Sequence, residues 1–399
     1  MDVEEAVTIG QRLRRIRVAR DKTQKVIADR AGISDGYLSL LESGKRPLDS
    51  LKLIKDLAYA LEIAPSELTS IPIPAPGNGH TDSAVEAVRH ALTAVDHGRP
   101  GGQVLPVEEL RGRASRLQDM RRRCQFAEVA DDLPGLIRDL HTSIAAGRDV
   151  ANLLELVVSV HVHVTRQWLK DAGASLELRS RATALARDMA REHGEVIPLG
   201  VATFATARAL LAGGMFDLAR AELDSVTLPA VTPETVGLVG GLMVRHALVA
   251  EADKRPGDVA APMEAAAELA QRFGETGDGD LLGFEFGPTE VALARMSLAL
   301  EAGEPDRAIS IAAGVQPQRL PSATRQAAYW VDFGRAAARL RGRRDDAVRA
   351  FLTAEDLFPV RVYRNPFARD AIAGLVERSR QDAVGRDLRR LAWRADLRV

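Results

Sequence analysis

One short stretch, TQKVIADRAGISDGYLSLLESGKRP, constrains the fold of this chain more than any other. It begins at Thr23, and its apolar residues recur with the period of a helix until Gly32 interrupts them. Thr23 and Ser34 are good N-cap residues, and glycine commonly ends a helix because it adopts positive φ without strain. The pattern therefore predicts one helix over 24–31, a tight turn, and a second helix running to about Ser43.

Other helices flank this pair. Apolar residues that begin at Ile9 keep a helical period before it, and a fourth helix is expected after Asp49 or Ser50. Pro65 suits the first position of a short last helix. Aromatic residues make up only 4% of the chain, so leucine, alanine and valine must fill the core, a mixture that favours packed helices. We expect an all-α protein whose N-terminal domain, 1–69, has five helices.

Two short helices that cross at a glycine turn form the helix-turn-helix arrangement, in which the second helix enters the major groove of DNA. Residues 9–68 resemble the Cro/repressor-type (XRE) helix-turn-helix family. The residues that carry this resemblance are Thr23, Gln24, Ala28, Gly32, Ser34, Leu38, Leu41, Glu42, Gly44 and Lys45. The resemblance implies a protein that binds double-stranded DNA.

The charge distribution agrees with this. Residues 9–55 hold twelve Lys and Arg against five acidic residues, a net charge of +7, although the whole chain has a formal net charge of −1. A basic domain therefore precedes an acidic remainder. Basic charge concentrated on one small domain is typical of contact with phosphates.

The predicted DNA contacts fall into two groups, phosphate contacts and base contacts. The resemblance implies that Gln24 binds a phosphate, and the exposed face of the second helix would contact bases. That face has no Arg, Gln or Asn for bidentate base contacts, so specificity is expected to be modest or to depend on DNA shape. The predicted set is Arg12, Arg15, Gln24, Ser34, Asp35, Gly36, Tyr37, Ser39, Leu40, Lys45 and Arg46.

Three simpler roles stay open for residues in this region. Ser34 can act as a helix cap alone, and Glu42 fits an internal ion pair better than a DNA contact. The arginines near position 15 can also form an ordinary solvated helix face, namely Arg14, Arg15 and Arg17.

A proline-rich segment follows the basic domain. Residues 70–80, SIPIPAPGNGH, contain three prolines and two glycines, so we predict a partly stiff linker over 70–81. A helix is expected near 82–96 and a loop over 97–103. Beyond about residue 105 the chain is predicted to form successive helices, because Pro and Gly recur at their ends and no alternating strand pattern is clear.

Three helix junctions in this larger part share a spacing, in which an alanine follows a glycine by five residues. The pairs are Gly214 with Ala219, Gly303 with Ala308, and Gly342 with Ala347. This spacing resembles the turn and second helix of a tetratricopeptide (TPR) hairpin, where a small residue allows close helix crossing. We therefore predict a TPR-like helical domain over 82–399, with a generic helical bundle as the alternative.

A second resemblance concerns the C-terminal third. The segments FGPTEV, which begins at Phe286, LPSATRQAAYWVDFGRAAARLRGRRDDAVRAFLTAED and RDLRRLAWRADLRV resemble the sensor part of actinobacterial XRE–TPR regulators. Those proteins usually have FGPTNV, and here Glu290 replaces the Asn, which implies a changed or lost ligand preference. The resemblance implies a cytoplasmic regulator that forms a homodimer and binds a peptide or small-molecule effector in its TPR groove.

The predicted effector site follows from placing the first helix of each hairpin on the concave side. A wall that mixes aromatic and charged side chains suits an amphipathic ligand. The simpler alternative is that the phenylalanines pack in the core and that Arg208 and Asp332 pair with neighbouring helices. The predicted set is Phe204, Arg208, Phe284, Phe286, Glu290, Ser297, Tyr329 and Asp332.

No motif predicts catalysis, a metal or a cofactor. His161 and His163 stand two apart, so on a helix they point away from each other. The apolar run that holds them, from Leu153, is too short to span a membrane and is expected to be a buried helix. The single cysteine, Cys124, and the acidic start of the chain favour the cytoplasm over export. Nearby arginines can lower the pKa of this thiol, although a thiol without function is the simpler expectation.

Together these patterns predict a DNA-binding transcription regulator that is not an enzyme. The alternative is a protein-interaction hub whose TPR domain binds a partner protein and whose N-terminal domain tethers it to DNA.

Overall fold

The computed structural model describes residues 9–46, 48, 50–63, 65–69, 79–228, 231–275, 284–320, 322–378 and 382–397. Over these residues the protein contains helices and no strand, which confirms the predicted all-α class. Most of the predicted linker, up to residue 78, lies outside the described part of the chain. Residues 79–81 already belong to a helix.

The N-terminal part, residues 9–69, is called the head. Its five predicted helices are confirmed, and they enclose a separate apolar core that includes Leu13, Ile27, Leu38, Leu41 and Leu57. The helices are α1 (Ile9–Ala19), α2 (Gln24–Ala31), α3 (Asp35–Glu42), α4 (Leu51–Leu61) and α5 (Pro65–Thr69).

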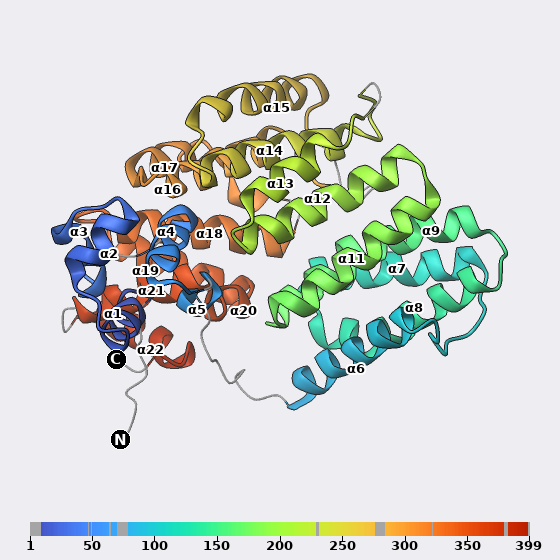
Figure 1. Ribbon diagram of the computed structural model, residues 1–399, viewed down its shortest axis with the longest axis horizontal. Helices are drawn as coiled ribbons and strands as arrows, with labels where there is room; N and C mark the ends of the chain where they lie inside the picture. The colour runs from blue at the N-terminus through green and yellow to red at the C-terminus, as the bar shows by residue number, and fades with distance from the viewer. Residues whose placement is uncertain are drawn as a thin grey trace.

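The remainder is called the body, and Figure 1 shows it as a curved stack of helices beside the head. Its first part contains α6 (Gly79–Asp96), α7 (Val107–Arg122), α8 (Phe126–Ala145), α9 (Val150–Ser159), η1 (Val160–Thr165), α10 (Arg166–Asp171) and α11 (Leu176–His193). Its middle part contains α12 (Val196–Ala212), α13 (Phe216–Asp224), α14 (Val236–Ala252), η2 (Pro256–Asp258), α15 (Ala260–Phe273), α16 (Pro288–Glu301), α17 (Pro305–Ala312) and η3 (Pro317–Arg319). Its last part contains α18 (Ala323–Ala338), α19 (Arg344–Leu357), α20 (Pro359–Tyr363), α21 (Pro366–Glu377) and α22 (Ala383–Arg394).

Helices α12 to α19 form four consecutive hairpins, and the first helices of these hairpins, α12, α14, α16 and α18, stack on one another. Three of the turns contain the predicted glycines, each with a positive φ of 71–78°. The alanine five residues after each glycine is fully buried, because close crossing of the two helices leaves room for a methyl group only. The buried alanines are Ala219, Ala308 and Ala347.

Two other hairpins have no glycine at this position. The turn between α7 and α8 places Cys124 at φ 62°, and the turn between α14 and α15 places Lys254 at φ 60°. Residues other than glycine seldom adopt this conformation, so the spacing that finds the glycine turns does not find these two.

The apolar run from Leu153 forms a buried helix, as predicted. Its second half, η1, is a π-helix. Both of its histidines are buried, and their rings contact different neighbours. His161 places its Nε2 3.0 Å from Nε2 of His141, and the ring of His163 meets the edge of Phe284, with 4.8 Å between ring centroids. π-helical turns are rare and frequently occur at functional sites.

The body curls until its last part contacts its first. Phe126, at the start of α8, stacks on Phe358, which precedes α20, with ring centroids 4.7 Å apart. Nη1 of Arg364 donates to the backbone carbonyl of Asp171 at 3.3 Å. Residues about two hundred positions apart therefore close the curve.

The head docks on the body through polar contacts at several points. The backbone N–H of Ile9 donates to Oδ1 of Asp370 at 2.9 Å, which places a carboxylate at the positive end of α1. Glu301 accepts from the backbone N–H of Lys52 at 2.7 Å. Nζ of Lys55 lies 4.0 Å from the centre of the Phe216 ring. These contacts hold the head against α13, α16 and α21.

Candidate nucleic-acid interface

The turn between α2 and α3 has the predicted geometry. Thr23 accepts a hydrogen bond from the backbone N–H of Val26, and Gly32 ends α2 with φ 68°. Ser34 caps α3 by accepting from the backbone N–H of Tyr37 at 3.2 Å. The caps and the glycine fix the angle between the helices, so the outer face of α3 points to solvent.

The exposed face of α3 contains the predicted base-contacting residues. Asp35, Gly36, Ser39 and Leu40 are all exposed, and no atom lies within 4 Å of the position that a Cβ would take on Gly36. Leu40 is 38% exposed. The docked head therefore leaves this face open, and the base contacts themselves stay a prediction.

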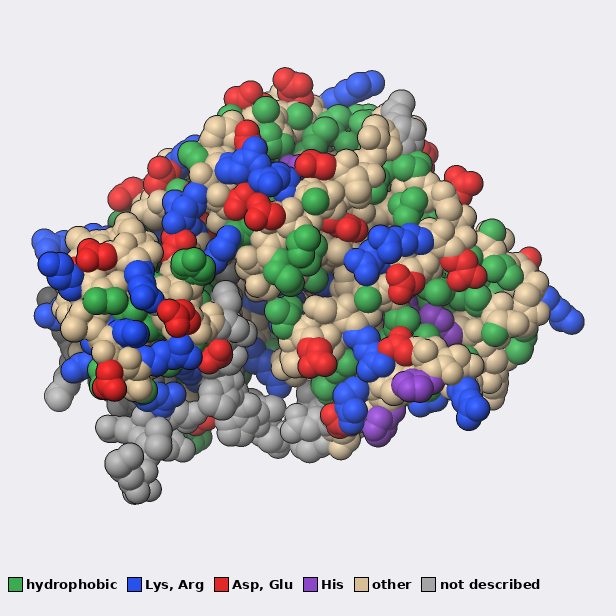
Figure 2. Space-filling model, in the orientation of Figure 1, with side chains coloured by type: hydrophobic (Ala, Val, Ile, Leu, Met, Phe, Trp, Pro, Cys, Tyr) green, Lys and Arg blue, Asp and Glu red, His purple; other side chains and the backbone are tan. Residues whose placement is uncertain are grey.

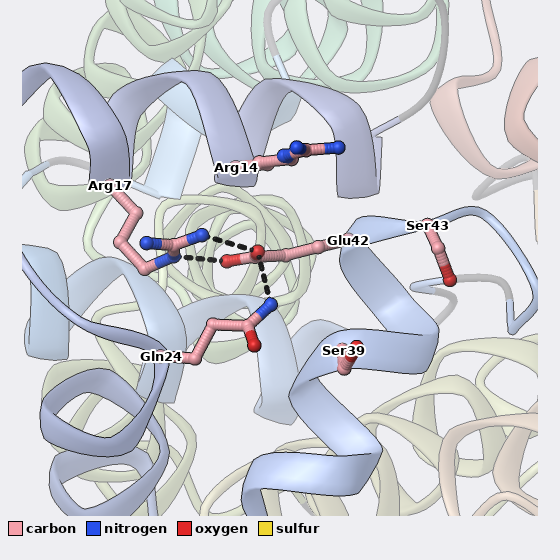
Figure 3. Close-up of a pocket in the computed structure, with 6 residues that line it drawn as sticks. All are labelled: Arg14, Arg17, Gln24, Ser39, Glu42 and Ser43. Atoms are coloured by element: carbon pink, nitrogen blue, oxygen red, sulfur yellow. Dashed lines mark hydrogen bonds and ion pairs between the residues drawn. The ribbon is translucent and has the colours of Figure 1, made fainter.

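Glu42 organises the side chains between α1, α2 and α3, as Figure 3 shows. Its carboxylate accepts from Nε of Arg17 at 2.5 Å and from Nη2 of Arg17 at 2.7 Å. The same carboxylate accepts from Nε2 of Gln24 at 2.8 Å. The internal ion pair expected for Glu42 is thus confirmed, and hydrogen bonding to Glu42 raises the pKa of Arg17.

Gln24 remains suited to its predicted role. It lies at the first position of α2, where backbone N–H groups favour an anion. An amide nitrogen carries two hydrogens, so the bond to Glu42 leaves one for a phosphate oxygen. A surface pocket of about 480 Å³ opens beside it, lined by Arg14, Arg17, Gln24, Ser39, Glu42 and Ser43.

Other basic side chains of the head are exposed as well. Arg15, Lys45 and Arg46 are exposed, and the guanidinium of Arg46 lies 5.5 Å from the centre of the Tyr37 ring. Arg14 was absent from the predicted set, although it is exposed and lines the pocket. The signal was its spacing of three from Arg17, which places both on one face of α1.

The prediction for Arg12 is wrong. Its side chain is only 6% exposed, and Nη1 donates to the backbone carbonyl of Leu68 at 3.2 Å. Arg12 therefore ties α1 to α5 inside the head and has no access to DNA.

Not all of the predicted effector residues are accessible. The predictions for Phe286 and Tyr329 are wrong. Phe286 is 2% exposed, and a Cβ on Gly240 would overlap its ring. Tyr329 is 5% exposed, and its hydroxyl donates to the carbonyl of Ala312 at 3.2 Å. Both are core residues.

The remaining predicted residues form two groups. The prediction for Phe284 is wrong for the same reason, since it is 6% exposed; its ring packs edge to face on Phe204, with ring centroids 4.9 Å apart. Arg208, one turn after Phe204 on α12, is half-buried. Farther along, Ser297 donates to Oδ2 of Asp332 at 3.1 Å. Glu290 forms an ion pair with Arg325, which also bonds to Glu285 at 2.8 Å.

Cys124 has no reactive character. Its thiol is half-buried, and burial raises its pKa to about 11. Arg121 and Arg361 do lower this pKa, as expected of nearby arginines, but burial and Asp171 outweigh them.

Comparison with known protein families identifies the N-terminal part of the chain. Residues 8–70 match the family described as Helix-turn-helix domain. No curated protein and no solved structure matches the chain. The head is thus a helix-turn-helix DNA-binding domain, in agreement with the geometry of α2 and α3. Among the described residues, no helix has the length and apolar character needed to cross a membrane.

Proposed function

We propose that this protein is a cytoplasmic transcription regulator that binds duplex DNA as a homodimer and whose TPR-like body senses an effector. The DNA-binding part is supported by one observation above all. An open α3 face stands beside Gln24 and exposed basic residues on a helix-turn-helix domain. In a two-fold dimer, two heads would bind half-sites about one helical turn apart.

The TPR-like part of the proposal is supported by the stacked hairpins and their glycine and alanine spacing. The docking of the head on α13, α16 and α21 supplies a route for regulation, because a change in the body's curvature would move the head. Such coupling requires that the effector bind the two arrangements with different affinity. The proposal includes no catalytic role.

The test begins with selection of duplexes from a random pool, followed by affinity measurements at several salt concentrations. Arg46→Ala should weaken binding roughly tenfold and reduce the salt slope by about 1, because a phosphate contact is lost. Gln24→Ala should weaken binding to a similar degree without changing the slope, because its amide is neutral. Arg307→Ala is the control, since that side chain is 70% exposed on α17. Unchanged affinity in both head variants would show that the assigned roles are wrong.

A further inference from the structure

The inside of the curved body holds basic side chains that come from distant parts of the sequence. Arg121 is on α7, Arg166 and Lys170 are on α10, Arg208 is on α12 and Arg245 is on α14. The segment η1 contacts α7, α10 and α12, and α12 packs on α14. Helix α20 joins them where the curve closes. We call this group the basic chamber, and it consists of Arg121, Arg166, Lys170, Arg208, Arg245 and Arg361.

These side chains form no close ion pair. No carboxylate within the described ranges lies within 4.0 Å of the charged groups of the basic chamber, and three of its arginines have an Nε without any hydrogen-bond partner. Those three are Arg121, Arg166 and Arg245. A buried polar group without a partner costs free energy, so a group of them needs an explanation.

Two measures together show where the chamber side chains lie. Burial is the main cause that lowers the pKa of Arg166 to about 9 and that of Arg245 to about 10. Burial also lowers the pKa of Arg208 well below its ordinary value. Yet Arg208 and Arg245 keep part of their surface accessible to solvent. Figure 2 shows a recess between the head and the body with basic side chains inside it.

A guanidinium keeps its proton in proteins, so these charges repel one another. Arg166, Arg245 and Arg361 each lower the pKa of Arg208 further. The neighbouring Arg325 shows the opposite situation. Burial lowers its pKa, but Glu290 and Glu285 more than compensate and raise it. Glu285 and Glu290 are thus paired with Arg325, and Glu285 also lies 3.5 Å from Arg122. Asp171 raises the pKa of Arg121, Arg166 and Lys170, so one carboxylate is shared among chamber cations that outnumber it.

An aromatic wall borders the chamber. The guanidinium of Arg245 lies 5.0 Å from the centre of the half-buried Phe204 ring, and Phe204 meets Phe284, which in turn meets His163. Nε2 of His163 has no hydrogen-bond partner. The chamber therefore offers several positive charges, one unused imidazole nitrogen and an apolar surface.

We propose that the basic chamber binds a small organic polyanion, with phosphate or carboxylate groups held by Arg166, Arg208 and Arg245 and an apolar part against Phe204. This inference rests on the proposed regulator and names the chemical class of its effector. A ligand of this class supplies the missing counter-charges and hydrogen-bond acceptors, so it stabilises the closed curve against which the head docks.

The test uses the full-length protein and calorimetric titration at constant ionic strength. The probes are inorganic tripolyphosphate, phosphate, phenyl phosphate and tricarballylate. We expect tripolyphosphate and tricarballylate to bind more tightly than phosphate, and their ratio distinguishes phosphate from carboxylate ligands. Phenyl phosphate should also exceed phosphate, because its ring contacts Phe204. Absence of binding by all four probes would overturn the inference.

Two substitutions test whether the anion binds in the basic chamber. Arg208→Gln and Arg245→Gln should each weaken tripolyphosphate binding about tenfold or more, because each removes hydrogen bonds between charged groups. Each should also leave the melting temperature of the free protein equal or higher, since an unpaired buried charge is removed. Arg295→Gln, an exposed arginine on α16, is the matched control. Unchanged affinity in both chamber variants would overturn the inference.

A double head variant, Lys45→Ala with Arg46→Ala, separates this site from the DNA surface, which is also basic. Tripolyphosphate binding that disappears in this variant alone would place the anion on the head and overturn the inference. DNA affinity without added anion tests the regulator independently. A protein that binds tripolyphosphate in the chamber but no duplex would overturn the proposed function and leave the anion site standing.

Discussion

The head and the basic chamber are both rich in arginine, but their arginines have opposite surroundings. In the head, Arg17 is paired with Glu42 and Arg30 lies 3.0 Å from Glu62, while Arg14 and Arg15 are exposed to water. In the chamber, Arg166 and Arg245 are desolvated, and no carboxylate of the described residues pairs with them.

This difference shows that the number of basic residues does not identify the ligand. Exposed cations around an open helix face attract a long polyanion such as DNA, because their charge is already solvated and little free energy is lost on contact. Cations held inside a curved body carry a desolvation cost in the free protein. A small anion that enters the chamber recovers that cost, which a rigid duplex cannot do for steric reasons.

The largest expected effect contrasts two arginines of the body. Arg325→Met should lower the free energy of unfolding by about 3 kcal/mol, because it removes the partner of the partly buried Glu290 and one of the two cationic partners of Glu285. Arg245→Met should leave stability unchanged or raise it by about 1 kcal/mol, because it removes an unpaired buried charge. Urea unfolding followed by tryptophan fluorescence measures both, since Trp168 is fully buried in the body. Equal destabilisation by the two variants would remove the distinction between paired and unpaired arginines.

A smaller effect is expected in the head. Glu42→Ala should destabilise the head by about 2–3 kcal/mol, since it leaves Arg17 without its partner in a partly buried site. The control is Glu62→Ala, whose ion pair with Arg30 is exposed and should contribute below about 0.5 kcal/mol. Hydrogen exchange of the α3 amides reports on the head alone. Similar exchange rates in the two variants would contradict the importance assigned to Glu42.

The smallest effect concerns pH. Burial lowers the pKa of His163 to about 3, whereas an unfolded histidine has a pKa near 6.5. The unfolded chain therefore binds more protons between these values, and the stability that His163 contributes is complete above pH 6.5 and declines as the pH falls. His163→Met should remove about 1 kcal/mol of the loss measured between pH 6.5 and 5.5. A polyanion in the chamber should also reduce this loss, and an identical pH profile for the variant would contradict the assignment.

Much of the head could be predicted because its determinants are local. Thr23, Gly32, Ser34 and Ser50 act on backbone groups within three or four residues, so their caps and turn are visible in the sequence. The same holds for the glycine turns of the body. The turns at Cys124 and Lys254 were missed, since the surrounding packing, and not the residue type, holds them at positive φ.

Some features of the candidate sites could be predicted from the sequence, and others depend on tertiary packing. Exposure of the α3 face follows from helix period, and the pairing of Glu42 was expected. The burial of Arg12 was not expected, because it depends on where α5 packs. Gly240 likewise carried no signal, although it makes room for Phe286.

Local patterns in the amino-acid sequence specify the helices, their caps and the basic charge of the head, because hydrogen bonds and apolar periods act over a few residues. Which charges are solvated, paired or unpaired depends on the tertiary structure. Arg121 and Arg361 are 240 positions apart, and they share one chamber because stacked hairpins accumulate curvature until Phe126 meets Phe358. Electrostatic environment is a property of that closed arrangement, and no local pattern encodes it.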